Sequence, residues 1–290
     1  MDLAPPRGTR DFYPEDMRLR NWLFDHFREV ARLYAFEEYD APLIEAEELY
    51  TRKGGEEILQ QLYTFEDKSG RHLAMRGEMT PSLARLILQK GRSLPLPVRW
   101  FSIPQCWRYE RMTRGRRREH YQLNLDIFGV AEVTAEIELL GALVTLFSRL
   151  GLGPGEVGIK ISNRKLLQGT LEQIGIPEDN FAPICILVDK LEKMPEEMVR
   201  EQMAALDVQP GQMDQIVQIL SLKSLTDAAT VLGDDQPGIR ELRELFALAS
   251  AYDFADWLTF DASLVRGLAY YTGTVFEAFD RQGSLRAICG

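Results

Sequence analysis

A run of arginines is the part of the sequence best suited to chemistry. Six arginines lie between residues 108 and 118, and Glu110 is the acid among them. Guanidinium groups stay charged at physiological pH and bind phosphate through paired hydrogen bonds. Such a run is also typical of a solvated surface turn. Because the whole chain is acidic, with 44 acids, 34 bases and a net charge of -10, a local concentration of cations favours one defined anionic ligand over general nucleic-acid binding.

Polar and apolar residues alternate directly after the arginine run. Between residues 118 and 129, Leu123, Leu125 and Ile127 lie on one face of a predicted strand. The opposite face carries polar side chains, namely Arg118, His120, Gln122, Asn124 and Asp126. Strands often turn such a face to water. However, Gln, Asn and Asp are depleted in strands, and three of them on one face also suit the floor of a site for a small polar ligand.

The composition excludes several classes of protein. With 290 residues, 45% of them hydrophobic and 27% charged, the chain can bury a sizeable core. No apolar run approaches the roughly 18–20 residues that a membrane span needs. The first residues lack the apolar core of a signal peptide, and the three cysteines form no CxxC pair. We therefore expect a protein of a reducing compartment, either the cytoplasm or an organellar matrix or stroma.

The hydrophobic periodicity predicts the elements that position these residues. Apolar residues at three- and four-residue spacing predict a helix over residues 18–34. Strand-like runs at 62–67 and 71–77 predict a hairpin, and Thr80 is the expected N-cap of a helix that ends near Gly91. A second hairpin is predicted with arms at 98–109 and 118–129 and the arginine run as its loop. A further helix is expected to end at Gly151.

The rest of the chain changes in character. Residues 163–254 are patterned almost wholly as helix, with breaks at proline and glycine, and strand signals return at 257–264 and 272–280. This order predicts an α+β fold, in which an antiparallel β-sheet flanked by helices is interrupted by a helical insertion. We expect a catalytic core at 1–162, the insertion at 163–255, and a return to the core at 256–290.

Five segments resemble the histidyl-tRNA synthetases, a family of class II aminoacyl-tRNA synthetases. Residues 107–126, W-R-Y-E-R-M-T-R-G-R-R-R-E-H-Y-Q-L-N-L-D, are similar to their motif 2. Residues 5–12 resemble the N-terminal signature, and the segment around Pro42 resembles the dimer-forming motif 1. Residues 75–85, M-R-G-E-M-T-P-S-L-A-R, resemble the amino-acid-binding loop. Residues 264–273, L-V-R-G-L-A-Y-Y-T-G, resemble a segment specific to the histidine enzymes.

The resemblance implies a class II synthetase fold and an ATP-dependent ligase. Such an enzyme activates L-histidine with ATP and Mg²⁺ to histidyl-adenylate and passes the acyl group to tRNA(His). It also implies a homodimer and no membrane partner. The alternative is a synthetase-like regulatory subunit of ATP phosphoribosyltransferase, which keeps the fold and loses catalytic residues. Here the residues in question are present, namely Glu78, Arg108, Gln122, Asp126 and Arg266, and this favours the enzyme.

The same resemblance assigns roles to single residues. Arg108 would contact the α-phosphate and the substrate carboxylate, and Arg266 would stabilise the transition state. Glu110 and Arg116 would hold ATP, directly or through Mg²⁺. The other assigned residues would bind the amino acid. Glu78, Met79 and Thr80 lie in the loop, where Glu78 and Thr80 would bind the ammonium group, and Gln122 would orient the substrate. Asp126 and Tyr271 would contact the imidazole, and Tyr270 would complete the pocket. A carboxylate facing a ring N–H would select histidine over isosteres that lack it.

Each of these residues also has a purely structural interpretation. Glu78 and Thr80 could serve the helix start, Tyr270 and Tyr271 could be core aromatics, and Asp126 could be an exposed strand carboxylate. The sequence reaches its last residue where motif 3 of the family would begin. We therefore expect a catalytic-core portion that lacks motif 3 and the anticodon-binding domain, with weak activity on its own.

Overall fold

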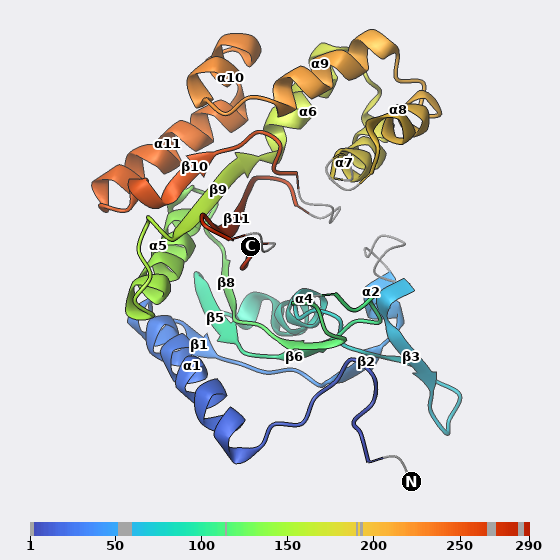
Figure 1. The fold of residues 1–290 in the computed structure, drawn as a ribbon, viewed down its shortest axis with the longest axis vertical. Coiled ribbons are helices and arrows are strands. Elements are labelled where there is room, and N and C mark those ends of the chain that lie inside the picture. The colour runs from blue at the N-terminus through green and yellow to red at the C-terminus, as the bar shows by residue number, and fades with distance from the viewer. Residues whose placement is uncertain are drawn as a thin grey trace. The chain divides into compact units, whose positions relative to one another are not determined.

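A computed structural model describes residues 3–51, 60–113, 115–189, 191, 194–265, 271–283 and 287–290 (Figure 1). The chain divides into two compact units, Met1–Ala131 and Glu132–Gly290. Both units combine helices with small β-sheets, most of whose strand pairs are antiparallel. The predicted α+β class is therefore confirmed.

The first unit begins with the predicted amphipathic helix. Helix α1 spans Pro14–Leu33 and starts four residues earlier than the periodicity predicts. Its first helical residue is Pro14, whose fixed φ suits that position. The backbone N–H of the N-cap residue Tyr13 donates to the Asp16 carboxylate at 3.2 Å. The start is thus set by local capping chemistry rather than by the apolar face.

The first predicted hairpin is confirmed. Strands β3 (Tyr63–Glu66) and β4 (His72–Met75) pair antiparallel, and β2 (Ile44–Ala46) joins β4 on its other side. Helix α2 covers Glu48–Thr51, and α4 covers Thr80–Lys90. The predicted N-cap is one residue off: Met79 is the N-cap of α4, and Thr80 is already helical. The proline that follows then takes the second helical position, which it also tolerates because the first turn leaves its N–H groups unpaired.

The second hairpin is present but divided into two short pairs. Strand β5 (Val98–Ser102) pairs antiparallel with β8 (Asn124–Phe128) and parallel with β1 (Glu37–Glu38). Strand β6 (Gln105–Trp107) pairs with β7 (Glu119–Tyr121). Pro104 lies at the division and has no N–H for a ladder bond, although its carbonyl oxygen accepts from the N–H of Gln122 at 3.3 Å.

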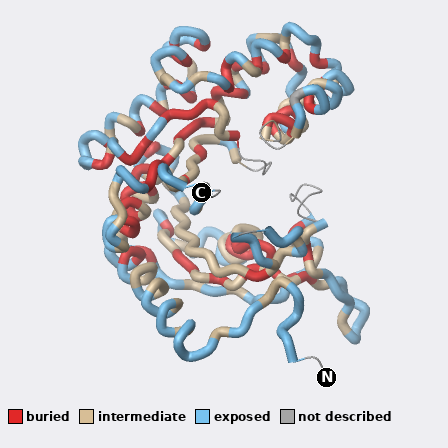
Figure 2. The backbone as a smooth tube through the Cα atoms, in the orientation of Figure 1, coloured by how far each residue is buried: buried red, intermediate tan, exposed pale blue. Residues whose placement is uncertain are grey.

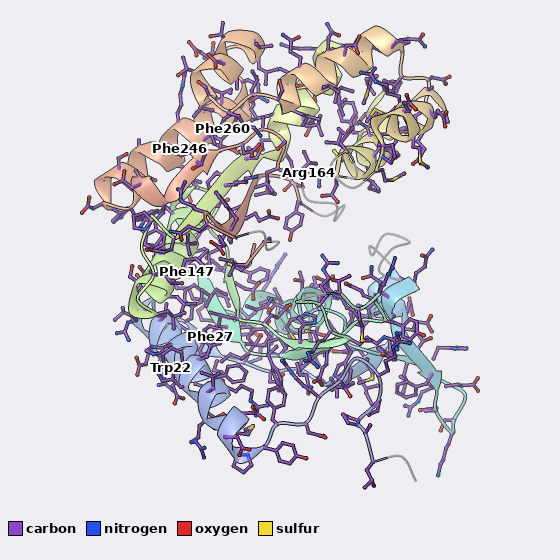
Figure 3. The ribbon with its side chains drawn as sticks, in the orientation of Figure 1. Trp22, Phe27, Phe147, Arg164, Phe246 and Phe260 are labelled. Atoms are coloured by element: carbon purple, nitrogen blue, oxygen red, sulfur yellow. The ribbon has the colours of Figure 1, made fainter. Side chains whose placement is uncertain are left out.

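The second unit is built around a three-stranded sheet. Its order is β10 (Leu258–Phe260), β9 (Val157–Asn163) and β11 (Thr274–Asp280), with β10 parallel and β11 antiparallel to β9. Sequence periodicity did not predict β9, although Ile159 and Ile161 are fully buried in it. Helix α5 (Thr134–Arg149) is followed, as predicted, by Gly151 with a φ of +79°. Phe147 of α5 and Phe260 of β10 belong to this core, and Phe246 of α11 (Pro237–Ala251) packs against it (Figure 3).

The helical stretch of the second unit divides between two apolar cores (Figure 2). Helices α10 (Leu225–Leu232) and α11 (Pro237–Ala251) pack into the core of the sheet. A separate core joins α6 (Arg164–Gln173), α7 (Phe181–Asp189), α8 (Glu196–Ala204) and α9 (Pro210–Leu220). The division of the chain at 162 and 255 stays a prediction. Among the described helices, none is long and apolar enough to cross a membrane.

Candidate active site

The loop between β4 and α4 is buried although it carries charged residues. Arg76 is 6% exposed, Glu78 is 7% exposed and Met79 is fully buried. A charge inside a protein is costly unless it is paired and hydrogen-bonded. The loop therefore depends on partners from other segments, and residues 76–79 are placed by those partners rather than by a regular element.

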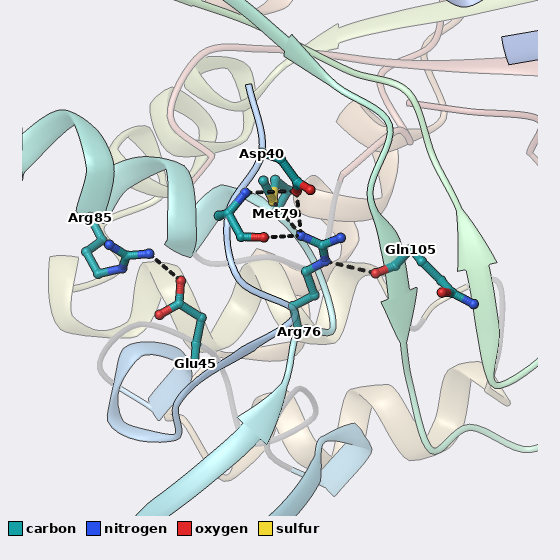
Figure 4. Close-up of polar contacts among 7 residues, drawn as sticks. Asp40, Glu45, Arg76, Met79, Arg85 and Gln105 are labelled. Carbon is teal, nitrogen blue, oxygen red and sulfur yellow. Dashed lines mark hydrogen bonds and ion pairs between the residues drawn. The ribbon is translucent and has the colours of Figure 1, made fainter. Parts of the chain in front are cut away.

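The guanidinium of Arg76 supplies the main attachment of this loop (Figure 4). Its Nη1 donates to the Asp40 carboxylate at 2.9 Å and to the Ala41 carbonyl at 2.8 Å. Its Nε donates to the Gln105 carbonyl at 2.9 Å, and the Met79 sulfur lies 3.8 Å from Nη1. One side chain thus joins the loop to the segment after β1 and to β6. Sequence reasoning missed Arg76, whose only signal was a lone arginine at the end of an apolar strand.

Arg108 connects the same loop to the arginine-rich hairpin. Its Nε donates to the carbonyl of Gly77 at 2.8 Å, and its backbone N–H donates to the carbonyl of Arg118 at 2.8 Å. Its Nη1 lies 3.8 Å from the Glu110 carboxylate. The side chain is 37% exposed, so the guanidinium keeps donors for a ligand while its Nε holds the loop. The predicted residues Glu78 and Arg108 therefore belong to one connected structure.

The tip of the hairpin presents cations to solvent. Thr113 and Arg116 form an isolated antiparallel bridge across Gly115, whose φ of +82° favours glycine. Nη1 of Arg116 donates to the Glu110 carboxylate at 3.0 Å. Glu110 is 15% exposed and Arg116 is 52% exposed. Since Arg117 is also exposed, the tip can offer guanidinium groups to an anion that arrives from solvent.

The N-terminal segment supports the base of this hairpin. The backbone N–H of Arg118 donates to the Gly8 carbonyl at 3.0 Å, and that of Arg10 donates to the Glu119 carboxylate at 3.0 Å. Glu119 is 4% exposed and also accepts from Gln105 at 2.9 Å. A Cβ at Gly8 would lie 2.7 Å from the Arg118 side chain, so the close approach requires glycine. Two segments picked out in the sequence are thus in contact.

The polar face of the predicted strand forms a connected series of side chains. The Gln122 amide donates to Asn124 Oδ1 at 2.7 Å, and its oxygen lies 3.2 Å from Nε2 of His120. All three side chains are partly buried. Burial, together with the Arg108 charge, lowers the pKa of His120. This face therefore differs from an ordinary solvated strand surface.

Asp126 lies on the same face and is more deeply placed. Burial raises the pKa of Asp126 to about 7. Its Oδ2 is buried and has no hydrogen-bonding partner among the described residues. The interpretation of Asp126 as an exposed strand carboxylate is therefore wrong. A buried carboxyl with an unused acceptor is a feature typical of a binding site.

Comparison with known proteins identifies the family. Residues 8–289 match the family described as histidyl-tRNA synthetase. This chain belongs to that family. It is 56% identical over its whole length to the chloroplastic/mitochondrial histidine–tRNA ligase of Arabidopsis thaliana, and 42% identical over 282 residues to the histidine–tRNA ligase of Leptospira biflexa. It spans 60% and 63% of the length of these two relatives.

Solved structures agree with the fold of the family. A histidyl-tRNA synthetase from Nostoc superposes with a TM-score of 0.78 at 23% identity, covering 96% of this chain and 65% of that one. A Bacillus halodurans protein described as an ATP phosphoribosyltransferase regulatory subunit/histidyl-tRNA synthetase superposes with a TM-score of 0.83 at 22% identity, covering 98% of this chain and 74% of that one. The fold is therefore that of the class II synthetases, as predicted.

The histidyl-tRNA synthetase residues predicted in the second unit are only partly described. Tyr271 is partly buried and precedes β11. Arg266 and Tyr270 lie outside the described residues. A groove in the first unit is lined by Tyr39 and Trp100 together with residues of α4. None of the predicted site residues that the structure describes lines that groove, and the candidate site is defined by the buried polar groups of the loop and the strand floor.

Proposed function

We propose that this chain is the catalytic-core portion of a histidine–tRNA ligase. In the proposed reaction, the carboxylate of L-histidine attacks the α-phosphate of ATP and pyrophosphate leaves. The terminal ribose hydroxyl of tRNA(His) then attacks the carbonyl carbon of the adenylate, so that the histidyl ester forms and AMP leaves. Chemistry of this kind requires mainly positioning and neutralisation of charge, and the first unit contains groups suited to both.

One observation carries this proposal. The Nε of Arg108 donates to the Gly77 carbonyl at 2.8 Å, and this bond joins the loop that carries Glu78 to the hairpin that carries Glu110 and Arg116. A site that activates an amino acid must hold an ammonium group, a carboxylate and a phosphate close to one another. Anionic and cationic side chains on two connected segments are suited to that arrangement.

The proposed roles differ between the two segments that Arg108 joins. Glu78 and Thr80 bind the ammonium group next to Met79, Gln122 orients the amino acid, and Asp126 accepts from the imidazole N–H. Arg108 has remaining guanidinium donors for the carboxylate and the α-phosphate. By family resemblance, Arg266 stabilises the transition state and Tyr270 and Tyr271 complete the imidazole pocket.

ATP and Mg²⁺ are assigned to the hairpin side. Arg116 binds the nucleotide phosphates, and Glu110 is the carboxylate for a phosphate-bound Mg²⁺. Mg²⁺ commonly takes one or two carboxylates together with phosphate oxygens and water. Among the described residues there is no group of three His, Cys, Asp or Glu side chains that could hold a metal. Coordination of Mg²⁺ by Glu110 together with phosphate oxygens is therefore consistent with these residues, whereas a site made only of protein ligands is not. The ion would neutralise phosphate charge.

The proposed partners also include a second copy of the chain. Leu19, Trp22 and Leu33 on α1 are 69%, 50% and 64% exposed, and Leu43 and Ile44 next to the motif 1 proline are 37% and 44% exposed. Large exposed apolar side chains often mark an interface. We propose a homodimer through these two segments of the first unit. Static light scattering of Trp22→Glu beside the unchanged chain tests it: a dimer that persists in the variant contradicts the assignment.

The place of action is proposed from the relatives. The Arabidopsis relative is named chloroplastic/mitochondrial, and we propose either the cytoplasm or an organellar matrix or stroma for this protein. A fluorescent fusion of the complete gene product, imaged with organelle markers, distinguishes these compartments. Accumulation at a membrane would contradict the proposal.

Histidine-dependent ATP–pyrophosphate exchange tests the function. The expected result is exchange that requires L-histidine and is absent with the other amino acids. Calorimetric titration with L-histidine accompanies it. Binding of histidine without exchange would favour a regulatory module, the first of the two descriptions that the Bacillus halodurans protein carries. The absence of both histidine binding and exchange would overturn the proposal.

A further inference from the structure

Ten buried side-chain polar atoms of the first unit lack a hydrogen-bonding partner among the described residues. Three of them lie on the β1–β5–β8 sheet or directly after one of its strands, namely Oη of Tyr39, Oγ of Ser102 and Oδ2 of Asp126. Ser102 is 1% exposed. Buried polar groups are nearly always hydrogen-bonded, because leaving one unpaired sacrifices its hydration without replacement. Three such atoms in one region require an explanation.

The β-sheet register brings the three side chains to one face. Ser102 and Trp100 are two residues apart on β5 and so point the same way, and Trp100 lies opposite Asp126 on β8. Tyr39 follows β1, and its N–H donates to the carbonyl of Phe101 at 2.9 Å. The ring centroids of Tyr39 and Trp100 are 5.5 Å apart. The three polar groups therefore come from three adjacent strands and meet around Trp100.

Their electrostatic coupling agrees with this placement. Burial raises the pKa of Tyr39, the Asp126 carboxyl raises it further, and the Ser102 hydroxyl, which approaches Tyr39 as a hydrogen-bonding group, lowers it. Tyr39 is thus close enough to both of the other side chains to respond to them. We call Tyr39, Ser102 and Asp126 the polar triplet.

We propose that Tyr39 and Ser102 act with Asp126 as the imidazole-recognising end of the histidine site. This inference rests on the proposed function and extends it to two residues that it does not use. A neutral imidazole offers one N–H donor and one nitrogen acceptor. The polar triplet offers a carboxylate acceptor and two hydroxyl donors. The ring N–H donates to Asp126, one hydroxyl donates to the other ring nitrogen, and the second hydroxyl donates to the carboxylate.

This arrangement explains why the three atoms are unpaired together. The ring pairs directly with the Asp126 carboxylate and with one hydroxyl, whereas an apolar isostere of the imidazole would leave these two groups without a ligand partner. A site whose buried polar groups need the correct ligand rejects an analogue that cannot pair them. Tyr39 and Ser102 would therefore determine specificity rather than the rate of the chemical step.

The chain contains a matched control for this test. Tyr50 and Ser82 also carry buried hydroxyls without a partner among the described residues. Burial raises the pKa of Tyr50, Ser82 acts in the opposite direction, and Glu45, Cys106 and, last, Glu78 are the smaller influences. Asp126 is not among the groups that act on Tyr50. Tyr50→Phe thus removes the same buried atom from the same unit without touching the polar triplet.

Calorimetric titration of four forms of the full chain tests the inference: unchanged, Tyr39→Phe, Ser102→Ala and Tyr50→Phe. The ligands are L-histidine, L-histidinol, which keeps the imidazole and lacks the carboxylate, and ATP. We expect Tyr39→Phe and Ser102→Ala each to weaken histidine and histidinol by the same factor of about 5–10, the loss for one hydrogen bond. ATP affinity should not change, and Tyr50→Phe should leave the affinity for all three ligands unchanged.

The outcomes separate this inference from the proposed function. If the unchanged chain binds no histidine, the proposed function fails and the inference fails with it. If histidine binds and both triplet variants retain its affinity within about twofold, the inference is overturned alone and the polar triplet holds only water. An equal loss in Tyr50→Phe would also overturn it, because removal of any buried hydroxyl would then suffice.

Discussion

The loop at residues 76–79 and the hairpin tip at residues 110–117 are built in opposite ways. The loop is buried, and the Arg76 guanidinium connects it to Asp40, Ala41 and Gln105. In the tip, residues 111–113 and 115–117 are exposed, and the described side-chain contacts include the ion pair between Arg116 and Glu110. In the proposed enzyme the first region binds the amino acid and the second binds ATP.

The difference indicates two strategies for binding. A buried, multiply bonded loop is organised before the substrate arrives, so little conformational entropy is lost on binding. An exposed arginine tip loses more order on binding but attracts an anion from solvent and adapts to it. Arg108 lies between the two regions, since it bonds to the Gly77 carbonyl and also approaches Glu110. The following predictions, from the largest expected effect to the smallest, test this contrast.

We expect the replacement of Arg108 to cause the largest loss of activity. It removes both the hydrogen bond that joins the loop to the hairpin and a proposed contact with the transition state. Arg108→Ala should slow histidine-dependent pyrophosphate exchange by about 10²–10³-fold, the range for loss of one such donor. Arg117→Ala is the matched control, since it removes an exposed arginine of the tip and should change the rate less than about threefold. Equal rates in the two variants would contradict the role of Arg108.

Replacement of Arg76 tests the buried side of the comparison. Arg76→Lys keeps the charge but cannot make the three oxygen contacts, so the free energy of unfolding should fall by about 1.5–3 kcal/mol. The matched control is Arg85→Lys. Its guanidinium pairs with Glu45 at 2.5 Å (Figure 4) and is 34% exposed, so the expected loss is below about 1 kcal/mol. Urea unfolding measures both, and equal losses would show that the Arg76 contacts are not special.

The pH dependence of stability tests the burial of Asp126. Its pKa rises from 3.8 to about 7 in the folded chain. The unfolded chain therefore loses this proton at lower pH, so the carboxyl destabilises the fold progressively as pH rises from 3.8 to about 7, and then by a constant amount. Asp126→Asn removes this contribution, so its stability relative to the unchanged chain should increase from pH 5 to pH 8, by at most about 1.4 kcal/mol per pH unit. A difference that stays constant across this range would show that Asp126 is not buried.

We expect the smallest loss of stability from the replacement of Arg116. The ion pair with Glu110 involves a side chain that is 52% exposed, so Arg116→Ala should change the free energy of unfolding by less than about 1 kcal/mol. Its effect on ATP affinity should be larger than that of Arg117→Ala in the same tip. Urea unfolding and nucleotide titration of the pair measure this, and a large loss of stability would mean that the tip is structural.

Strongly periodic elements were predictable from the sequence. Helix α1, the β3–β4 hairpin and helix α5 follow from local patterns that tertiary packing does not override. Strand β9 was missed although it has seven residues, because it lies between a glycine-rich turn and a helical region and itself contains Gly158 and Lys160. The N-cap of α4 differed by one residue, since Thr80 and the proline after it can occupy either of two adjacent positions.

The candidate site was predictable only as a set of residues. Motif spacing and family resemblance picked out Glu78, Arg108 and Asp126, but not the contacts that hold them. Arg76 bonds to Asp40 and to Gln105 across 36 and 29 residues, a relationship that no local pattern encodes. The burial of Asp126 likewise depends on its register opposite Trp100. Such information comes from the fold.

The central claim is that the amino-acid side is held by buried contacts and the nucleotide side by exposed arginines. Calorimetric titration of Arg76→Lys and Arg116→Ala with L-histidine and with ATP, each ligand alone, tests it most directly. We expect Arg76→Lys to weaken histidine about tenfold and ATP less than about twofold, and Arg116→Ala to show the reverse, where tenfold corresponds to about 1.4 kcal/mol. Equal losses for both ligands in both variants would contradict the division of the site.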